Sequence, residues 1–294
     1  VGPVDTITPN GWRLVKATTV PAMQECFLRA LAAHFIPSAV ERGYNFPPFS
    51  PLRHTLSIML ELEKQTGESR LNFIEMALVV QLSSPELGVE NIVKNILKLR
   101  SARLASPNKR GFDTTEYKKA GETHDYAPNT FKDYADTNLR YIKASGLVQG
   151  KGRGISLVPE KHLFIEELTK DTQPPATDFD YFKTIADGAK LPTDNLSSAT
   201  LVLNDLLTQL QNRGIPFSTS GRATDTPADI EVIRHDIEGL LSEANEVTYA
   251  SQQASQWEEI AGYMELLITR GNKKTLSNGE EIEVPQSEAP AYFE

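Results

Sequence analysis

Cysteine is almost absent from this chain of 294 residues, which contains only Cys26. A single cysteine excludes an intramolecular disulfide framework and zinc modules built from several cysteines. The compartment that we expect is the cytoplasm, where thiols stay reduced. Because Cys26 lies within an apolar helical pattern, we interpret it as a small core residue rather than a nucleophile.

The chain also lacks long apolar runs and the pattern of a signal peptide. No stretch approaches the roughly 20 apolar residues of a membrane-spanning helix, and the first residues are neither basic nor apolar. We therefore expect no membrane partner. Hydrophobic residues make up 39% of the chain, which is enough for a folded core, and the length predicts two or three domains.

Catalytic motifs are scarce as well. The five histidines form no close metal-binding pair, and no GxSxG nucleophile motif occurs. The glycine-rich stretch 150–154 lacks the GK[ST] ending of a phosphate-binding loop, so we interpret it as a basic hairpin turn. Acidic pairs such as Glu258-Glu259 are typical of a solvated face. The sequence thus shows no complete active site and no complete metal site.

Charge is distributed unevenly along the chain. The formal net charge is −9, yet residues 91–160 carry 13 basic and 7 acidic side chains. Clustered Lys and Arg are typical of a surface that binds a polyanion, although a solvated basic face is the alternative. Residues 221–294 are strongly acidic, with 15 acidic and 5 basic side chains. This last segment favours a different partner, since it would repel DNA.

Apolar periodicity predicts a helical N-terminal half. Asn10-Gly11 indicates a turn that ends a strand in the first ten residues. Ser69 is the expected N-cap of a third helix, and Gly67 ends the second. The predicted segments are a helix over about 21–35, a loop over 43–52, a helix over about 52–64, a helix from about 69, and a helix over about 86–103.

Periodicity is lost over 104–128, where we predict a long, mobile, basic loop. A helix over 129–145 follows, with Gly146 in the position of a C-terminal glycine. Two short apolar strands on either side of the turn 150–154 predict a β-hairpin, and a helix over about 159–170 comes next.

The remainder combines a linker with further helices. Proline and aspartate mark 171–195 as a linker. Leucine and isoleucine periodicity then predicts antiparallel helices around 201–210, 230–241 and 257–267. Both ends of the chain look cut from a longer protein, because each begins or ends within an expected element.

The run 69–158 has the element order of a winged helix-turn-helix domain, in which helices precede a helix with a polar face and a hairpin with a basic tip. A helix fits the major groove, and long cationic side chains reach phosphates and guanine edges. The helix over 129–145 would present Lys132, Thr137, Arg140 and Lys143, and the hairpin would place Lys151 and Arg153 beside phosphates.

A second interpretation of the same run stays open. Winged-helix folds also serve as protein-interaction modules, and Asp133 and Asp136 on the same helical face would repel phosphates. We therefore carry three hypotheses. These are a DNA-recognition region, a winged-helix transcription regulator with a helical dimerisation domain, and a helical protein-interaction scaffold.

The residues also resemble a known family, the AlwI-like type IIS restriction endonucleases, which include nicking enzymes. The resemblance runs in order along nearly the whole chain. It is carried by Ile7-Thr8 with Gly11 and Leu14, Phe27-Leu28 with Leu31, Leu71 to Leu78, Glu90 to Arg100, Tyr134 to Asp136 with Arg140-Tyr141, Gly146-Leu147, Leu157 to Lys161, and Phe293-Glu294.

The resemblance implies a mainly α fold with small β-hairpins, in which winged helix-turn-helix-like subdomains precede a helical linker domain. It implies double-stranded DNA as partner, with a second nuclease subunit as a further candidate, and a bacterial cytoplasm as location. The implied division is a remnant of a first subdomain over 1–50, a recognition subdomain over 51–170, a linker over 171–195, a helical connector over 196–285, and the start of a nuclease domain over 286–294.

The resemblance also implies a catalytic role for Glu294, as the first acid of a nuclease site whose other residues are missing here. A nuclease of this type needs several carboxylates to hold Mg²⁺. We therefore expect Mg²⁺ in the parent enzyme, no cofactor for DNA binding, and a fragment that binds DNA without cutting it. The expected DNA-binding residues are Lys109, Arg110, Lys118, Lys119, Lys132, Thr137, Arg140, Lys143, Lys151 and Arg153.

Overall fold

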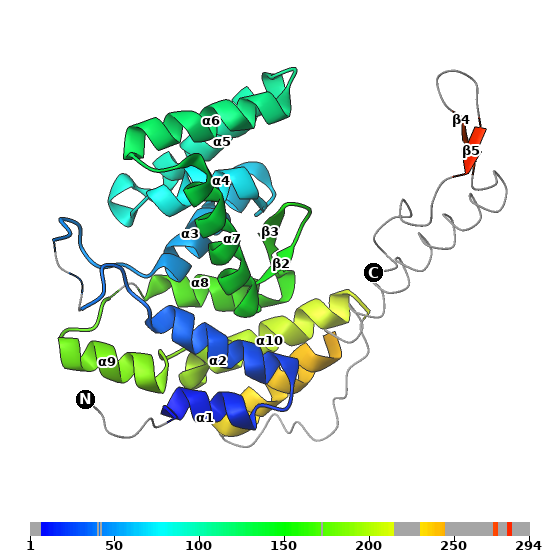
Figure 1. Cartoon of the computed structure of the whole chain (residues 1–294). Helices are drawn as coiled ribbons and strands as arrows, with labels where there is room; N and C mark the ends of the chain where they lie inside the picture. The colour runs from blue at the N-terminus through cyan, green and yellow to red at the C-terminus, as the bar shows by residue number, and fades with distance from the viewer. Residues whose placement is uncertain are drawn as a thin grey trace. The chain divides into compact units, whose positions relative to one another are not determined.

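A computed structural model describes residues 7–39, 41, 43–171, 173–214 and 230–244, and the backbone of 273–275 and 281–283. The described chain is mostly helical and contains a small three-stranded antiparallel sheet (Figure 1). The prediction of a mainly α fold with small hairpins is confirmed. The chain divides into two compact units, Val1–Leu240 and Leu241–Glu294. The five-part division expected from the sequence stays a prediction.

Among the described residues, the first unit contains the labelled helices and the three-stranded sheet. Its elements are α1 (Pro9–Lys16), α2 (Val20–Ala33), α3 (Pro51–Thr66), β1 (Leu71–Asn72), α4 (Phe73–Leu78), α5 (Val89–Ala105), α6 (Lys109–His124), α7 (Pro128–Ala144), β2 (Val148–Gly150), β3 (Gly154–Leu157), α8 (His162–Lys170), α9 (Asp178–Asp187), α10 (Leu196–Asn212) and a helix over 230–244 that continues into the second unit.

Helix α3 is the centre of the hydrophobic core. Ser50 accepts a hydrogen bond from the Arg53 N–H, Pro51 opens the helix, and Gly67 ends it with φ 75°. α3 packs against α5 and α8, and its fully buried side chains are Leu56, Ile58, Met59 and Leu62. Here the sequence prediction is confirmed, because proline, glycine and apolar periodicity all indicate the same helix.

The three-stranded sheet corrects one helix boundary. Ser69 is not a helix cap, because its hydroxyl accepts a hydrogen bond from the Leu157 N–H of β3. β1 pairs antiparallel with β3, and β3 pairs antiparallel with β2, so the strand order is β1-β3-β2. The helix begins later, at Phe73, where Asn72 and Glu75 form a capping box. A strand of two residues has no periodicity of its own to reveal it.

The prediction of an N-terminal strand and turn is also wrong for the described residues, which form a helix from Pro9. Thr8 accepts a hydrogen bond from the Gly11 N–H at 3.1 Å, and Pro9 occupies the first position of α1. Asn10 is buried inside this helix, where its Nδ2 donates to the Cys26 carbonyl at 3.0 Å. Helix capping therefore overrides the turn preference of Asn10-Gly11. Cys26 is buried, as predicted, and burial raises the pKa of its thiol.

The segment 171–195 is more ordered than the expected linker. It contains α9, capped by Thr177, which packs against α1 and α2. The 3-10 turn Pro192–Asp194 follows and leads into α10. Gly188 adopts φ 81°, and a Cβ there would lie 2.8 Å from the Arg29 Cβ. The close approach to α2 explains why glycine stands at this position.

The helices predicted near 201–210 and 230–241 are confirmed, because α10 and the helix over 230–244 occupy these positions. Ile233, Ile237 and Leu240 form the buried stripe of the second of these helices. In the second unit, β4 (Lys273–Thr275) pairs antiparallel with β5 (Glu281–Glu283). The helix expected around 257–267 and the expected catalytic Glu294 lie outside the described residues.

Candidate nucleic-acid interface

Helix α7 turns one face to the core and the opposite face to solvent. Pro128 opens the helix, and Gly146, with φ 68°, follows its last turn. The buried face packs against α4 and α2 through Phe131, Ala135, Leu139 and Ile142. The exposed residues include Lys132, Asp133, Asp136, Arg140 and Lys143, together with Tyr134 and Tyr141, and Thr137 is half-buried. The helix predicted over 129–145 is thus confirmed, and its polar residues lie on the solvent side.

The charged side chains on this face differ in their partners. The Arg140 guanidinium lies 2.8 Å from the Asp136 carboxylate one turn away, so a neighbouring residue orients it. Lys132 Nζ donates to Asn129 Oδ1 at 3.3 Å and lies 5.0 Å from the centre of the Tyr117 ring. Lys143 has no hydrogen-bond or ion-pair partner in the described part of the chain.

The β2–β3 hairpin follows α7 directly. Its turn contains Lys151, Gly152 and Arg153, all exposed, as the sequence predicts. Gly152 adopts φ 59°, a conformation that favours glycine. Lys151 Nζ lies 4.0 Å from Glu68 Oε2, a loose pair between two side chains that are each at least half exposed.

Two contacts attach this turn to α4. The Phe73 N–H donates to the Arg153 carbonyl at 2.8 Å. The Arg153 guanidinium lies over the Phe73 ring, 5.7 Å from its centre. A cation over an aromatic face is attracted to the negative face of the ring. The turn is therefore attached to the body of the fold, and Arg153 keeps its hydrogen-bonding N–H groups available.

Helix α6 corrects the prediction of a mobile loop over 104–128. Asn108 caps this helix by accepting a hydrogen bond from the Gly111 N–H at 2.9 Å. Arg103 of α5 binds Asp113 through two hydrogen bonds of 2.6 and 2.9 Å. Tyr117 is buried between the helices, and burial raises its pKa to about 12. An ion pair and one aromatic side chain hold a helix that has almost no apolar stripe.

The four cations expected on that loop therefore lie on α6. Lys118 pairs with Glu122 at 3.9 Å, and Lys119 pairs with Glu116 at 2.6 Å. These two lysines share a mixed, solvated face. Lys109 and Arg110 lie exposed at the N-terminal end of the helix, and their side chains have no ion-pair partner among the described residues.

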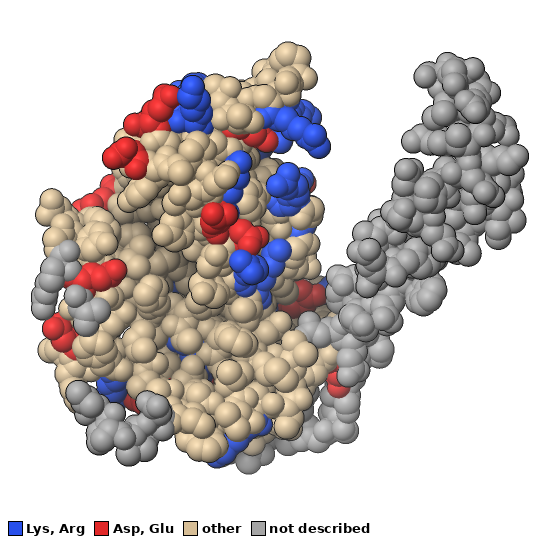
Figure 2. Space-filling model, viewed as in Figure 1, with Lys and Arg blue, Asp and Glu red and all other residues tan. Residues whose placement is uncertain are grey.

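One cation near the hairpin, Arg70, was not among the DNA-binding residues expected from the sequence. Arg70 precedes β1, and its Nη2 lies 3.3 Å from the position that a Cβ would occupy at Gly152. The chain thus folds a distant arginine against the hairpin turn. No sequence signal points to this contact, because β1 has only two residues and no periodicity of its own. Figure 2 shows Lys and Arg over the region of α6, α7 and the β2–β3 hairpin, with carboxylates among them.

The comparison with family models identifies the chain. The model of the AlwI restriction endonuclease matches residues 2–294. The chain belongs to this family. As an AlwI family member it is a type II restriction enzyme, which makes it a nuclease of restriction–modification systems with DNA as its substrate. A comparison with curated proteins finds no match to this chain.

The catalytic residues of this AlwI family member are not placed by the structure. Glu294, the expected first acid, lies outside the described residues. The described residues contain no group of three or more His, Cys, Asp or Glu side chains that could hold a metal ion. We derive no hydrolytic step from the described residues. None of the helices described is long and apolar enough to cross a bilayer.

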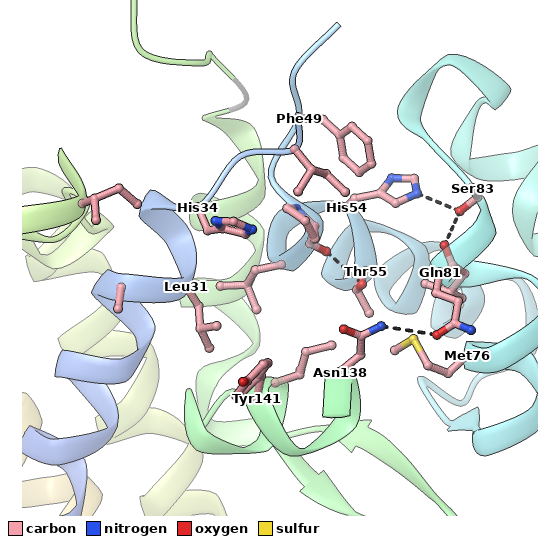
Figure 3. A pocket seen from close by; sticks show the side chains of 17 residues that line it. Leu31, His34, Phe49, His54, Thr55, Met76, Gln81, Ser83, Asn138 and Tyr141 are labelled. Atoms are coloured by element: carbon pink, nitrogen blue, oxygen red, sulfur yellow. Dashed lines mark hydrogen bonds between the residues drawn. The ribbon is translucent and has the colours of Figure 1, made fainter. Parts of the chain in front are cut away.

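A separate cavity of about 500 Å³ lies between α2, α3, α4 and α7 (Figure 3). His54 Nε2 lies 2.9 Å from Ser83 Oγ, and burial lowers the pKa of His54 to about 4. Asn138 and Tyr141 of α7 reach the cavity from the opposite side, where Asn138 Nδ2 donates to Gln81 Oε1 at 3.3 Å. None of the lining side chains is an Asp, Glu, Lys or Arg, so the cavity does not match a phosphate group.

Proposed function

We propose that this chain recognises a short asymmetric site in double-stranded DNA, with α7 in the major groove and the β2–β3 hairpin beside the backbone. It would serve as the recognition and linker region of a type IIS-like restriction or nicking endonuclease. The parent enzyme would hydrolyse phosphodiesters a few base pairs away. The observation that carries the proposal is the basic, solvent-facing side of α7 directly beside a basic hairpin turn.

The order of elements supports this proposal. α3, β1, α4, α7, β2 and β3 follow one another in the order of a winged helix-turn-helix domain, with α5 and α6 inserted before α7. The strand order β1-β3-β2 places β3 in the middle of the sheet and β2 at one edge. In such domains the helix that precedes the hairpin enters the major groove. Here that helix is α7.

We assign base recognition to Arg140 and Lys143. Arg and Lys bind the O6 and N7 atoms of guanine, and a bidentate contact distinguishes one base pair by about 1–3 kcal/mol. The Asp136 carboxylate orients Arg140. Because the carboxylate is paired with this guanidinium, it repels phosphates less. Thr137 and Lys132 lie at the edges of the same face. The hairpin cations would bind phosphates, as would Lys109 and Arg110 of α6, and such contacts position the protein without specifying sequence.

The catalytic part of the proposal rests on the family. Mg²⁺ in the parent enzyme and a role for Glu294 stay expectations, as does a second nuclease subunit. We infer that the chain by itself binds DNA without cutting it. Family membership favours a restriction enzyme over the regulator and the scaffold. A bacterial cytoplasm fits the same function.

The decisive experiment measures binding by fluorescence anisotropy with duplexes that contain randomised five-base sites, at several salt concentrations. Sequencing of the bound DNA identifies any preferred site. We expect enrichment of one asymmetric site and an affinity that falls steeply with salt. Salt-dependent binding without enrichment would contradict the base-recognition role of α7. The absence of binding at low salt would overturn the proposal.

A further inference from the structure

Arg70 lies where α3 ends and the sheet begins, against the turn of the β2–β3 hairpin. Its Nη2 would lie 3.3 Å from a Cβ at Gly152, closer than side chains ordinarily approach. A Cβ at Gly152 would crowd the guanidinium, and the φ of 59° at this position favours glycine in any case. Two guanidinium groups therefore lie at the hairpin turn, that of Arg70 and that of Arg153, which lies over the Phe73 ring.

The backbone of Arg70 is held firmly while its side chain stays available. Arg100 Nη2 donates to the Arg70 carbonyl at 3.0 Å. Arg100 is itself bound through two hydrogen bonds of 2.9 Å to Glu75, whose side chain is buried. By contrast, the Arg70 guanidinium has no hydrogen-bond or ion-pair partner among the described residues, and its Nε is a buried donor without an acceptor.

The charges around the hairpin turn do not balance. Arg70, Lys151 and Arg153 gather there, and Lys143 Nζ of α7 would lie 3.9 Å from a Cβ at Gly150. Among the described residues, only one carboxylate forms an ion pair with any of these four cations. It is Glu68, whose Oε2 lies 4.0 Å from Lys151 Nζ. Four cations with one loosely bound carboxylate leave an excess of positive charge at the hairpin turn.

We propose that Arg70 and Arg153 form a phosphate-binding pair at the hairpin turn, and that the pair binds the phosphate backbone of duplex DNA. The planar guanidinium offers two parallel N–H donors that match the oxygens of a phosphate. The inference rests on the proposed function. It adds a residue outside the hairpin and outside α7 to the DNA-binding surface, and it gives the unpartnered guanidinium an acceptor.

The test compares Arg70→Ala and Arg70→Lys with the wild-type chain in salt-dependent binding to the selected duplex. Losing one phosphate contact lowers the slope of log affinity against log salt by about 0.9. Over the tenfold range from 1 M to 0.1 M salt, the variant would therefore gain about eightfold less affinity than the wild-type chain. We expect this loss for Arg70→Ala, with unchanged site preference. Arg70→Lys keeps the charge and should keep most of the slope. Lys183→Ala, on the exposed surface of α9, is the matched control and should leave the slope unchanged.

A second measurement locates the contact and does not depend on the fold of one variant. Single neutral methylphosphonate groups are placed along the duplex backbone. One position should weaken binding of the wild-type chain and have no further effect on Arg70→Ala. If every position weakens both proteins equally, or if Arg70→Ala keeps the wild-type slope, the phosphate pair is overturned while the proposed function stands. If the wild-type chain binds no duplex, both proposals fail together.

Discussion

Arg29 on α2 and Asp194, at the end of the 3-10 turn Pro192–Asp194, are 165 residues apart and form a two-pronged ion pair. Arg29 Nη1 lies 2.7 Å from Oδ2, and Nη2 lies 2.6 Å from Oδ1. Nη1 also donates to the Ala189 carbonyl at 3.0 Å. A single buried guanidinium thus attaches the segment that follows α9 to the N-terminal helices.

The same cluster reaches a third segment of the chain. Arg234, in the helix over 230–244, lies 2.9 Å from Glu25 Oε1, and Glu25 also pairs with Arg29. Thr19 Oγ1 donates to Glu238 Oε1 at 2.6 Å. Three segments that are distant in sequence therefore meet around α2. The cluster stabilises the N-terminal part of the first unit, next to the helix that packs against α7.

Asp194→Asn is expected to destabilise the fold. The Arg29 side chain is only 5% exposed and would lose its bidentate partner. Breaking a buried pair costs about 3–5 kcal/mol, and we expect about 2–3 kcal/mol because Asp194 is partly exposed. Urea unfolding at pH 7 measures the difference. Asp178→Asn, an exposed carboxylate of α9, is the control and should change the free energy of unfolding by less than about 0.5 kcal/mol.

The pair of Arg29 and Asp194 also predicts that the stability of the fold falls at acidic pH. Burial by itself raises the pKa of Asp194, but hydrogen bonds from Arg29 and from the Leu191 N–H hold it below its ordinary value of 3.8. Because the folded pKa is the lower one, the stabilisation is complete above the ordinary value and is lost as pH falls through the folded pKa. Asp194→Asn should therefore show a smaller loss of stability below pH 4 than the wild-type chain does.

His54 predicts a second pH dependence, at higher pH. Burial lowers its pKa from 6.5 to about 4, so the fold favours the neutral ring. This contribution is complete above pH 6.5 and falls by about 3 kcal/mol as pH approaches 4. His54→Gln keeps a donor for Ser83 and cannot be protonated, so its melting temperature should fall less between pH 7 and 5. A wild-type slope in this variant would contradict the assignment; His124→Gln, which is exposed, should keep that slope.

Arg140→Ala should relax the sequence preference of DNA binding. The loss of one bidentate contact to guanine costs about 1–3 kcal/mol at a single base pair and leaves the other positions unchanged. Selection of bound sequences from a randomised pool measures this directly. Lys183→Ala again provides the control for lost charge. An unchanged selected site in Arg140→Ala would remove Arg140 from base recognition.

Asp136→Asn tests the orientation of that arginine. The substitution removes a negative charge from the exposed face of α7 and releases the Arg140 guanidinium from its 2.8 Å partner. We expect tighter binding to unrelated duplexes and a weaker preference for the selected site. Equal changes in both affinities would mean that the carboxylate acts through charge alone.

The cations of α6 should separate into two classes. The double variant Lys109→Ala with Arg110→Ala removes two cations that have no ion-pair partner among the described residues. If both bind phosphates, the slope of log affinity against log salt should fall by about 2. Lys118→Ala with Lys119→Ala removes two cations that already pair with Glu122 and Glu116, so the slope should change by less than about 1. The reverse order would show that the exposed side of α6 faces the DNA.

Several elements could be predicted from local signals alone. α2, α3, α5 and α7 have apolar residues at helical spacing, and proline, glycine or a capping residue stands at their ends. A glycine-rich turn between two apolar strands predicts the β2–β3 hairpin. In these elements propensity, patterning and end signals agree, so neighbours are not needed to choose the structure.

The missed elements depend on distant partners. α6 contains little apolar surface, and an ion pair to α5 and one buried tyrosine hold it in place. β1 is a strand only because β3, more than 80 residues later, pairs with it. α9 stands between prolines, which mark a linker by composition, yet α1 and α2 give it a packing surface.

The sequence by itself determined the helical class, the basic segment and the polar face of α7, because each depends on residues that are close together in the chain. Only the tertiary structure decided that Arg70 lies beside the hairpin turn, that residues 109–124 form a helix, and that Arg29 meets Asp194. Charge counts do not record partners. Which residue stands beside the hairpin turn, and which carboxylate a buried arginine meets, depends on contacts between segments far apart in sequence.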